Sequence, residues 1–252
     1  MSTELFRLDG RTAMVTGART GIGRAIAVGL AAAGADLVLV GHRDDLGEVA
    51  EEAGSHGAAV EQVAVDLLQP RTAAEALHPV FAARDIDVLV NNAGIVHRGP
   101  VAELGLDDWQ RVLDIDLNSV FALSGLAGRQ MLARGSGKII NIASLLSFQG
   151  GVLVPAYAAA KHAVAGLTKS MANEWAPHGV QVNAIAPGYI ATGFTAALRE
   201  DAERDEEITR RIPAGRWGRP DDLVGAAVFL ASAASDYVNG HVLVVDGGWL
   251  AR

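Results

Sequence analysis

Short apolar runs alternate with longer amphipathic segments along this chain, and that rhythm restricts the folds open to it. The runs are rich in Val, Ile and Leu and too short for helices, which is typical of strands buried on both faces of a parallel sheet. They are Thr12–Val15, Leu37–Val40, Val60–Val65, Val88–Val90, Lys138–Ile142, Val180–Ile185 and Val242–Val245. Segments with helical spacing separate them, at Ile22–Ala33, Asp44–Ser55, Thr72–Ala83, Leu106–Ala133, Ala156–Ala176 and Asp221–Ala231. The alternation predicts an α/β fold, with a doubly wound sheet of seven parallel strands and helices on both faces.

A chain of 252 residues fits one large domain of this kind, so we expect a single domain over residues 1–252. One stretch breaks the rhythm. Leu198–Arg211 is the most charged part of the chain and follows a Pro-Gly loop. It fits either a solvated helix face or a mobile lid, over residues 194–212, that covers a site.

Composition excludes several classes of site and partner. The chain has no Cys, so disulfides, thiolate catalysis and Cys-ligated zinc or iron–sulfur sites are excluded, and no metal site is predicted. Lys and Arg number 21 against 29 Asp and Glu, a net charge of −8 that argues against a nucleic-acid partner. The start of the chain carries Glu4 and Asp9, and the apolar run Ile26–Ala35 is too short to cross a bilayer. We therefore expect a cytoplasmic protein without a membrane segment.

A glycine-rich loop follows the first predicted strand and opens the first predicted helix. It reads Thr16-Gly17-Ala18-Arg19-Thr20-Gly21-Ile22-Gly23. Gly17 can turn the chain sharply, and the later glycines let backbone and helix approach closely. Exposed N–H groups at a helix N-terminus attract an anion such as a pyrophosphate. The spacing is G-x-x-x-G-x-G rather than the usual G-x-G-x-x-G, but its place between strand and helix predicts dinucleotide binding.

The end of the second predicted strand indicates which dinucleotide is bound. An acid there would accept hydrogen bonds from ribose hydroxyls, whereas a base would pair with a 2′-phosphate. The chain reads Gly41-His42-Arg43-Asp44, with no acid at the strand tip and Arg43 close by. These residues favour NADP(H), although His42 and Arg43 also fit an ordinary exposed loop.

A tyrosine and a lysine share one face of a predicted helix. Tyr157 and Lys161 are four residues apart, which places phenol and ammonium side by side. A nearby cation lowers the pKa of a tyrosine from its usual value near 10, so the phenol can exchange a proton with a carbonyl or an alcohol. Ser144 follows the strand Lys138–Ile142, at the edge where open α/β sheets bind ligands. Y-x-x-x-K alone also fits a surface pair, but with Ser144 and the glycine loop it predicts a catalytic site.

With these motifs in this order, the chain resembles the short-chain dehydrogenase/reductase family over nearly its whole length. The matching segments are TGARTGIG at 16–23, Asp66-Leu67, NNAG at 91–94, Ser144, YAAAK at 157–161, Pro187-Gly188 with Thr192, and Asp246-Gly247-Gly248. The resemblance implies a Rossmann-type fold and an oxidoreductase that uses NAD(P)(H).

The resemblance also implies a role for each site residue. Tyr157 is the general acid/base, Lys161 lowers its pKa and holds the nicotinamide ribose, and Ser144 orients the substrate oxygen. The cofactor residues expected from the motifs and the resemblance together are Gly17, Arg19, Thr20, Gly21, Ile22, Gly23, His42, Arg43, Asp66, Leu67, Asn92, Ala93, Gly94, Tyr157, Lys161, Pro187, Gly188, Ile190 and Thr192.

One position departs from the family pattern. The family has an Asn that joins the catalytic group, and the corresponding residue here is Asp116, within DIDLNSVF. The nearby Asn118 lies on a different helix face. An Asp can accept the same hydrogen bonds and its charge can pair with Lys161. The substitution therefore predicts retained activity with an altered pH profile.

Segments outside the shared motifs resemble family members that act on six-carbon sugar acids such as 2-dehydro-3-deoxy-D-gluconate. These segments are Ile142–Gly151, Met171–Trp175, Ile212–Gly218 and Asp236–Arg252. The resemblance implies a keto–hydroxyl interconversion in carbohydrate metabolism. It favours NAD(H) as the cofactor, whereas the residues after the second predicted strand favour NADP(H). A sugar acid brings a carboxylate, for which Arg is the best partner. Arg98 is the first candidate, followed by His97, Gln149 and Arg216, and each also fits an exposed loop residue.

Two other functions fit the sequence. One is a family member acting on a polyol, a 3-oxoacyl thioester or a cyclic alcohol. The other is a non-catalytic protein that only binds a dinucleotide, which the presence of both Tyr157 and Lys161 disfavours. The resemblance further implies a homotetramer, in keeping with the prevalence of closed symmetric assemblies.

Overall fold

The computed structural model describes residues 3–252, whose strands form a seven-stranded parallel sheet in the order β3-β2-β1-β4-β5-β6-β7. The strands are β1 (Thr12–Thr16), β2 (Asp36–Gly41), β3 (Val60–Ala64), β4 (Val88–Asn91), β5 (Gly137–Ile142), β6 (Val180–Pro187) and β7 (Val242–Val245). The winding reverses between β1 and β4, which are paired in the sheet. The predicted doubly wound fold is therefore confirmed, and a crevice is expected at the carboxyl ends of these two strands.

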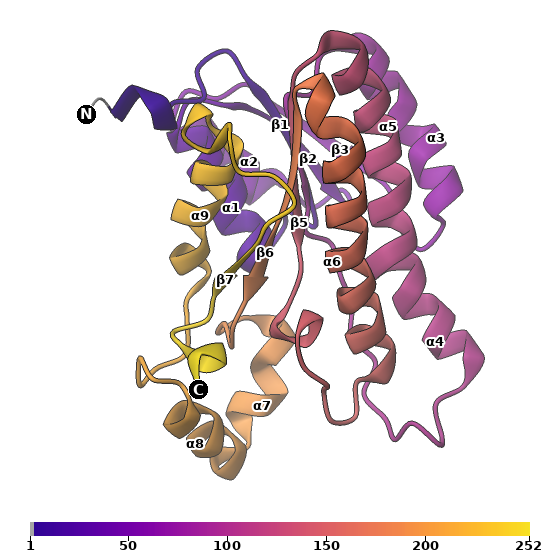
Figure 1. Cartoon of the computed structure of the whole chain (residues 1–252), viewed down its shortest axis with the longest axis vertical. Helices are drawn as coiled ribbons and strands as arrows, with labels where there is room; N and C mark the ends of the chain where they lie inside the picture. Colours follow the sequence, from indigo (N-terminus) through magenta and orange to yellow (C-terminus); the bar gives the residue numbers. More distant parts are fainter. Residues whose placement is uncertain (1–2) are drawn as a thin grey trace.

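Helices cover both faces of the sheet because successive residues of each strand point to opposite sides (Figure 1). In β2, Leu37 and Leu39 belong to one buried cluster, whereas Val38 and Val40 belong to the other. The first cluster is completed by α1 (Gly21–Ala32), α2 (Gly47–Gly54) and α9 (Val224–Ala231). The second is completed by α3 (Pro70–Ala83), α5 (Ser119–Arg134) and α6 (Pro155–Trp175).

The expectation that all seven strands are fully buried was wrong for the two edge strands. β3 carries Glu61 and alternates between half-buried and exposed residues, and every residue of β7 is half-buried. An edge strand has a neighbour on one side only, and the helices do not extend over it as they do over the centre. β1, β2 and β4 to β6 are buried as predicted.

The long helix expected over Leu106–Ala133 is interrupted. α4 (Leu106–Leu113) passes into a π-helical segment, Asp114–Asn118, before α5 begins. Such a π-bulge inserts one residue into a helix and is frequent at functional sites. Here it contains Asp116, which is completely buried.

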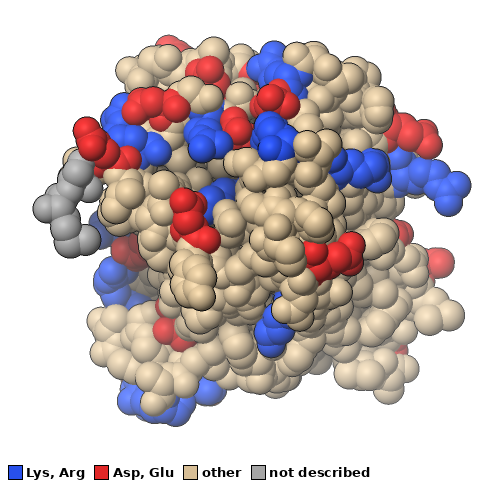
Figure 2. Space-filling view, turned by 45° about the horizontal axis from the view of Figure 1, so that its top comes forward, with Lys and Arg blue, Asp and Glu red and all other residues tan. Residues whose placement is uncertain are grey.

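Ion pairs lie at the amino ends of the strands. Arg11 pairs with Asp87 at 3.3 Å, and Lys138 pairs with Asp236 at 2.7 Å. Figure 2 shows Lys and Arg interspersed with Asp and Glu over the face turned toward the top of Figure 1. Within residues 3–252, no helix is both long enough and apolar enough to cross a membrane.

Candidate active site

A cavity of about 910 Å³ opens at the carboxyl ends of the strands. Its wall includes every residue predicted for the cofactor, the substrate or catalysis except Arg43, His97 and Arg216. His97 instead lies 3.5 Å from the Asp108 carboxylate, and Arg43 is exposed. The further candidate Arg216 also lies outside the cavity wall and pairs with Asp222 at 2.7 Å. Residues that are distant in sequence, from Gly17 to Trp249, therefore meet at this single cavity.

The glycine loop is held against the end of β4. Gly17 has a φ of +64°, and a Cβ on Gly23 would lie 2.3 Å from the Gly17 carbonyl oxygen, so neither position tolerates a side chain. The Asn92 side-chain amide donates to the carbonyl oxygens of Thr16 and Gly17 at 2.9 and 3.1 Å. Asn92, which the resemblance placed along the cofactor, thus also fixes the shape of the loop.

The loop leaves a helix N-terminus open toward the cavity. Thr20 precedes α1 and, among residues 3–252, no side chain caps the first N–H groups of this helix. Thr20, Gly21, Ile22 and Gly23 all line the cavity. Free N–H groups and the helix dipole suit a pyrophosphate. The structure therefore fits the dinucleotide that the sequence predicts, with Arg19, His42 and Asp66 also in the wall.

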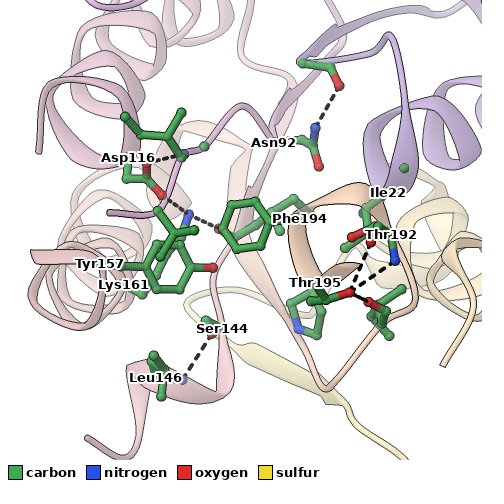
Figure 3. Close-up of a pocket in the computed structure, with 18 of the residues that line it drawn as sticks. Ile22, Asn92, Asp116, Ser144, Leu146, Tyr157, Lys161, Thr192, Phe194 and Thr195 are labelled. Carbon is green, nitrogen blue, oxygen red and sulfur yellow. Dashed lines mark hydrogen bonds and ion pairs between the residues drawn. The ribbon is translucent and has the colours of Figure 1, made fainter. Parts of the chain in front are cut away.

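Ser144, Tyr157 and Lys161 meet in the same cavity (Figure 3). Ser144 lies two residues after β5 and caps the 3-10 helix Leu145–Ser147, where its hydroxyl oxygen accepts a hydrogen bond from the Leu146 N–H at 3.1 Å. Its own O–H can donate toward the Tyr157 phenol. α6 carries Tyr157 and Lys161, and the Lys161 Nζ lies 5.4 Å from the centre of the Tyr157 ring. Tyr157, Lys161 and Ser144 thus face the same cavity.

Lys161 and Asp116 form a buried ion pair behind the tyrosine. The Lys161 Nζ lies 3.2 Å from Oδ2 of Asp116 and donates to the Ile142 carbonyl at 3.0 Å. Oδ1 of Asp116 accepts a hydrogen bond from the Ile95 N–H at 2.8 Å. Burial opposes the charge of Lys161, but Asp116 and Tyr157 outweigh it and raise the pKa of Lys161. Burial raises the pKa of Asp116, and Lys161 opposes that rise.

The environment of Tyr157 differs from the sequence expectation. Burial raises the pKa of Tyr157 above its usual value, Lys161 lowers it, Asp116 raises it again and the interaction with Ser144 lowers it. The net pKa of Tyr157 is raised because burial outweighs Lys161 and Ser144, and the Asp116 carboxylate adds to the rise. The predicted effect of Lys161 is present but smaller than the effect of burial.

The charged stretch Leu198–Arg211 forms α7 (Ala196–Glu200) and α8 (Ala202–Arg211), which lie beyond the carboxyl ends of the strands (Figure 1). Sequence reasoning left open whether it is a solvated face or a lid. Its inner side covers part of the cavity through Leu198, Arg204, Glu207, Ile208 and Arg211. None of these residues was singled out from the sequence, because no local pattern separates an arginine facing a cavity from one facing solvent.

Aromatic residues complete the wall of the cavity beside α7 and α8. The Phe194 ring packs against the Tyr157 ring with centres 5.6 Å apart. The Tyr189 ring packs against both Trp217 and Trp249, with centre distances of 5.4 and 4.7 Å. Trp249 was not predicted as a site residue. The one sequence signal for it was the resemblance of the segment Asp236–Arg252 to sugar-acid enzymes.

Comparisons with known proteins agree with this geometry. Residues 17–250 match a family model described as "Enoyl-(Acyl carrier protein) reductase". The chain is 57% identical, over 99% of its length and 98% of the relative, to 2-dehydro-3-deoxy-D-gluconate 5-dehydrogenase of Bacillus subtilis (strain 168).

Two solved structures are also similar. One, described as an NAD(P) dependent gluconate 5-dehydrogenase from Beutenbergia cavernae with NADP bound at low occupancy, has a TM-score of 0.97 and 56% identity, covering 98% of this chain and 100% of that one. The other is a gluconate 5-dehydrogenase from Burkholderia cenocepacia J2315 in complex with NADP and tartrate. It has a TM-score of 0.94 and 44% identity, covering 99% of this chain and 98% of that one.

Proposed function

The chain belongs to the short-chain dehydrogenase/reductase family, and from this premise we propose that it interconverts a keto and a hydroxyl group of a sugar acid such as 2-dehydro-3-deoxy-D-gluconate. It is an NAD(P)-dependent oxidoreductase. The observation that carries the proposal is that Ser144, Tyr157 and Lys161 share one cavity with the glycine loop and with arginines suited to a carboxylate.

We assign the proton chemistry to Tyr157. A nicotinamide cofactor held by the glycine loop and the cavity wall would supply or accept the hydride. In the reducing direction the Tyr157 phenol donates a proton to the substrate oxygen, and in the oxidising direction its phenolate takes that proton back. Ser144 donates its O–H to the same oxygen and so fixes the carbonyl beside Tyr157. The Lys161 ammonium stabilises the phenolate and is itself kept charged by Asp116.

Asp116→Asn is expected to shift the acid limb of the pH–rate curve for alcohol oxidation. The Asp116 charge raises the pKa of Tyr157, so its removal lowers that pKa and the phenolate forms at lower pH. The limb should move by roughly one pH unit toward acid, with activity retained. Asp114→Asn, which removes a carboxylate from the same π-helical segment without touching Lys161, is the control. An unchanged profile for Asp116→Asn would refute the role of Asp116.

We propose that NADP(H) is the preferred cofactor and that NAD(H) is also used, although the sequence resemblance favoured NAD(H). The tip of β2 has no acid, and His42 and Arg19 line the cavity there. Arg19 lies 3.5 Å from the Asp45 carboxylate, an exposed pair from which Arg19 can turn to a 2′-phosphate. The two solved relatives hold NADP. A ratio of kcat/KM that favours NAD(H) would overturn this preference.

The proposed function is tested by following nicotinamide absorbance with each cofactor across a substrate panel. The panel contains sugar acids, the corresponding polyols, a 3-oxoacyl thioester and a cyclic alcohol. The highest kcat/KM is expected for a six-carbon sugar acid. A higher value for another class would replace the substrate assignment, and no turnover of any of them would favour a protein that only binds a dinucleotide.

Arg98→Ala is expected to raise the KM for the sugar acid much more than the KM for the cofactor. Arg98 follows β4, lines the cavity and, within residues 3–252, takes part in none of the ion pairs. A charge-assisted contact with the substrate carboxylate is worth about 10-fold or more in affinity. Steady-state kinetics with each ligand varied in turn measures both constants. Equal changes in the two KM values would count against the contact.

We also propose a cytoplasmic homotetramer, as the family resemblance implies. Apolar side chains on two helices are left uncovered in the single chain, with Leu106 on α4 82% exposed and Phe121 on α5 65% exposed. Exposed apolar groups of this size mark contact surfaces when they form a patch. Light scattering of the purified protein gives the mass, and a monomer would contradict the proposal.

A further inference from the structure

Three arginines gather at the lid end of the cavity. Arg98 comes from the segment after β4, and Arg204 and Arg211 come from α8. Burial raises the pKa of Tyr189, which lines the same cavity, and the charges of Arg204, Arg211 and Arg98 all oppose that rise. Glu207, which pairs with Arg204, is an acid in the same part of the wall. This end of the cavity therefore carries a net positive charge.

Arg211 has the geometry of a binding group rather than of a structural ion pair. Its guanidinium carbon lies 3.9 Å from the centre of the Trp249 ring. Stacking on an indole fixes the plane of the guanidinium and leaves its N–H edge free. Within residues 3–252 no carboxylate pairs with Arg211, whereas Arg204 pairs with Glu207. A planar anion can thus receive two parallel hydrogen bonds from that edge.

The Trp249 ring on which Arg211 stacks packs against the segment that carries Ser144. Trp249 is buried and packs in one cluster with Ile208 and Ile212 of the lid and with Leu145, the residue after Ser144. Its indole N–H donates to the Gln149 side-chain oxygen at 3.5 Å. The lid end of the cavity and the serine that faces the substrate oxygen are therefore held together by a shared apolar core.

The Arg252 side chain holds the end of α8. The Arg252 guanidinium donates to the Arg210 carbonyl at 2.9 Å and to the Arg211 carbonyl at 3.2 Å through Nε. These are carbonyls that a helix leaves without partners at its C-terminus, where a cation is also favoured by the helix dipole. Arg252 thereby fixes the backbone from which the Arg211 side chain extends.

We propose that Arg211 binds the carboxylate of the substrate on the lid side, opposite Arg98, and that Arg252 is a positioning residue for Arg211. The inference rests on the proposed sugar-acid function and names the group that recognises the acid. It makes Arg252, which acts only through Arg211, part of substrate selection. A neutral polyol of equal length has no carboxylate, so Arg211 should not contribute to its binding.

The test measures binding without turnover. The protein is saturated with NADPH, which cannot react with an alcohol, and calorimetry then compares D-gluconate with D-glucitol, which has the same carbon chain and no carboxylate. Arg211→Gln removes the charge at nearly constant size. Arg210→Gln, the same change at an exposed neighbour outside the cavity wall, is the matched control. Arg252→Ala and Arg252→Lys test the positioning role, and kcat and KM for the sugar acid are measured for every variant.

Arg211→Gln should weaken D-gluconate binding and raise the sugar-acid KM by about 10- to 100-fold, with kcat and D-glucitol binding changed little. Arg210→Gln should match the wild type. Arg252→Ala should raise the same KM by a smaller factor, and Arg252→Lys, which can still donate to the carbonyls, should restore it.

Unchanged D-gluconate binding in Arg211→Gln would overturn the proposal, and so would equal losses for D-gluconate and D-glucitol, which would indicate a disordered lid. A wild type that turns over polyols better than any sugar acid overturns the proposed function instead. In that case a selective loss of D-gluconate binding in Arg211→Gln still supports an anion site.

Discussion

Tyr157→Phe should lower kcat by about 100- to 10,000-fold in both directions, the range typical of a lost general acid/base. The phenylalanine ring keeps the packing against Phe194 and leaves the Lys161–Asp116 pair in place. Only the proton-carrying hydroxyl is removed, so the KM for the cofactor and the free energy of unfolding should change little. Steady-state rates, together with a fluorescence titration of the reduced cofactor, measure both effects.

The control for this variant is Tyr237→Phe. Tyr237 is fully exposed and outside the cavity wall, so the same loss of a hydroxyl should leave turnover unchanged. A Tyr157→Phe enzyme that turned over as fast as the wild type would remove Tyr157 from the mechanism. A large loss of cofactor binding in the same variant would mean that the hydroxyl supports the cofactor instead of the proton transfer.

Lys161→Met should abolish measurable turnover and also destabilise the fold by about 3 to 5 kcal/mol, because it leaves Asp116 as a buried charge without a partner. Asp116 is completely buried and Lys161 is 3% exposed, so the Asp116 carboxylate is poorly solvated without the ammonium. Burial raises the pKa of Asp116, and in this variant Lys161 no longer opposes it. A carboxyl group whose pKa is higher in the folded than in the unfolded protein lowers the free energy of unfolding once the pH rises above its unfolded pKa. The loss of stability should therefore grow as the pH rises from about 4.

The double variant Lys161→Met/Asp116→Asn separates the two effects. With no charge left in the interior, it should recover most of the stability while staying inactive. Lys169→Met, an exposed position on the same helix, should change neither property. Urea denaturation at pH 5 and pH 8 provides the measurement. A Lys161→Met protein as stable as the wild type at pH 8 would show that the pair is not a buried ionic contact.

Much of the fold could be predicted because its signals are local. Strands such as Leu37–Val40 are continuous apolar runs, and their alternation with helices leaves a doubly wound sheet as the matching arrangement. The interruption of the helix at Asp114–Asn118 could not be predicted, since no local spacing marks the π-bulge, and its contact between Asp116 and Lys161 joins two different helices. The partial exposure of β7 likewise depends on its place at the sheet edge.

The sequence by itself determined the glycine loop, the Tyr157–Lys161 pair and the strand-end Ser144, because spacing along one strand or helix decides which side chains share a face. Only the tertiary structure decided the end of the cavity beside α8, where we propose that the substrate carboxylate binds. Arg98, Arg211, Trp249 and Arg252 come from three distant segments, and they come together only when α8 packs on the C-terminal segment. It also decided the net direction of the Tyr157 pKa, since burial is a property of the folded molecule.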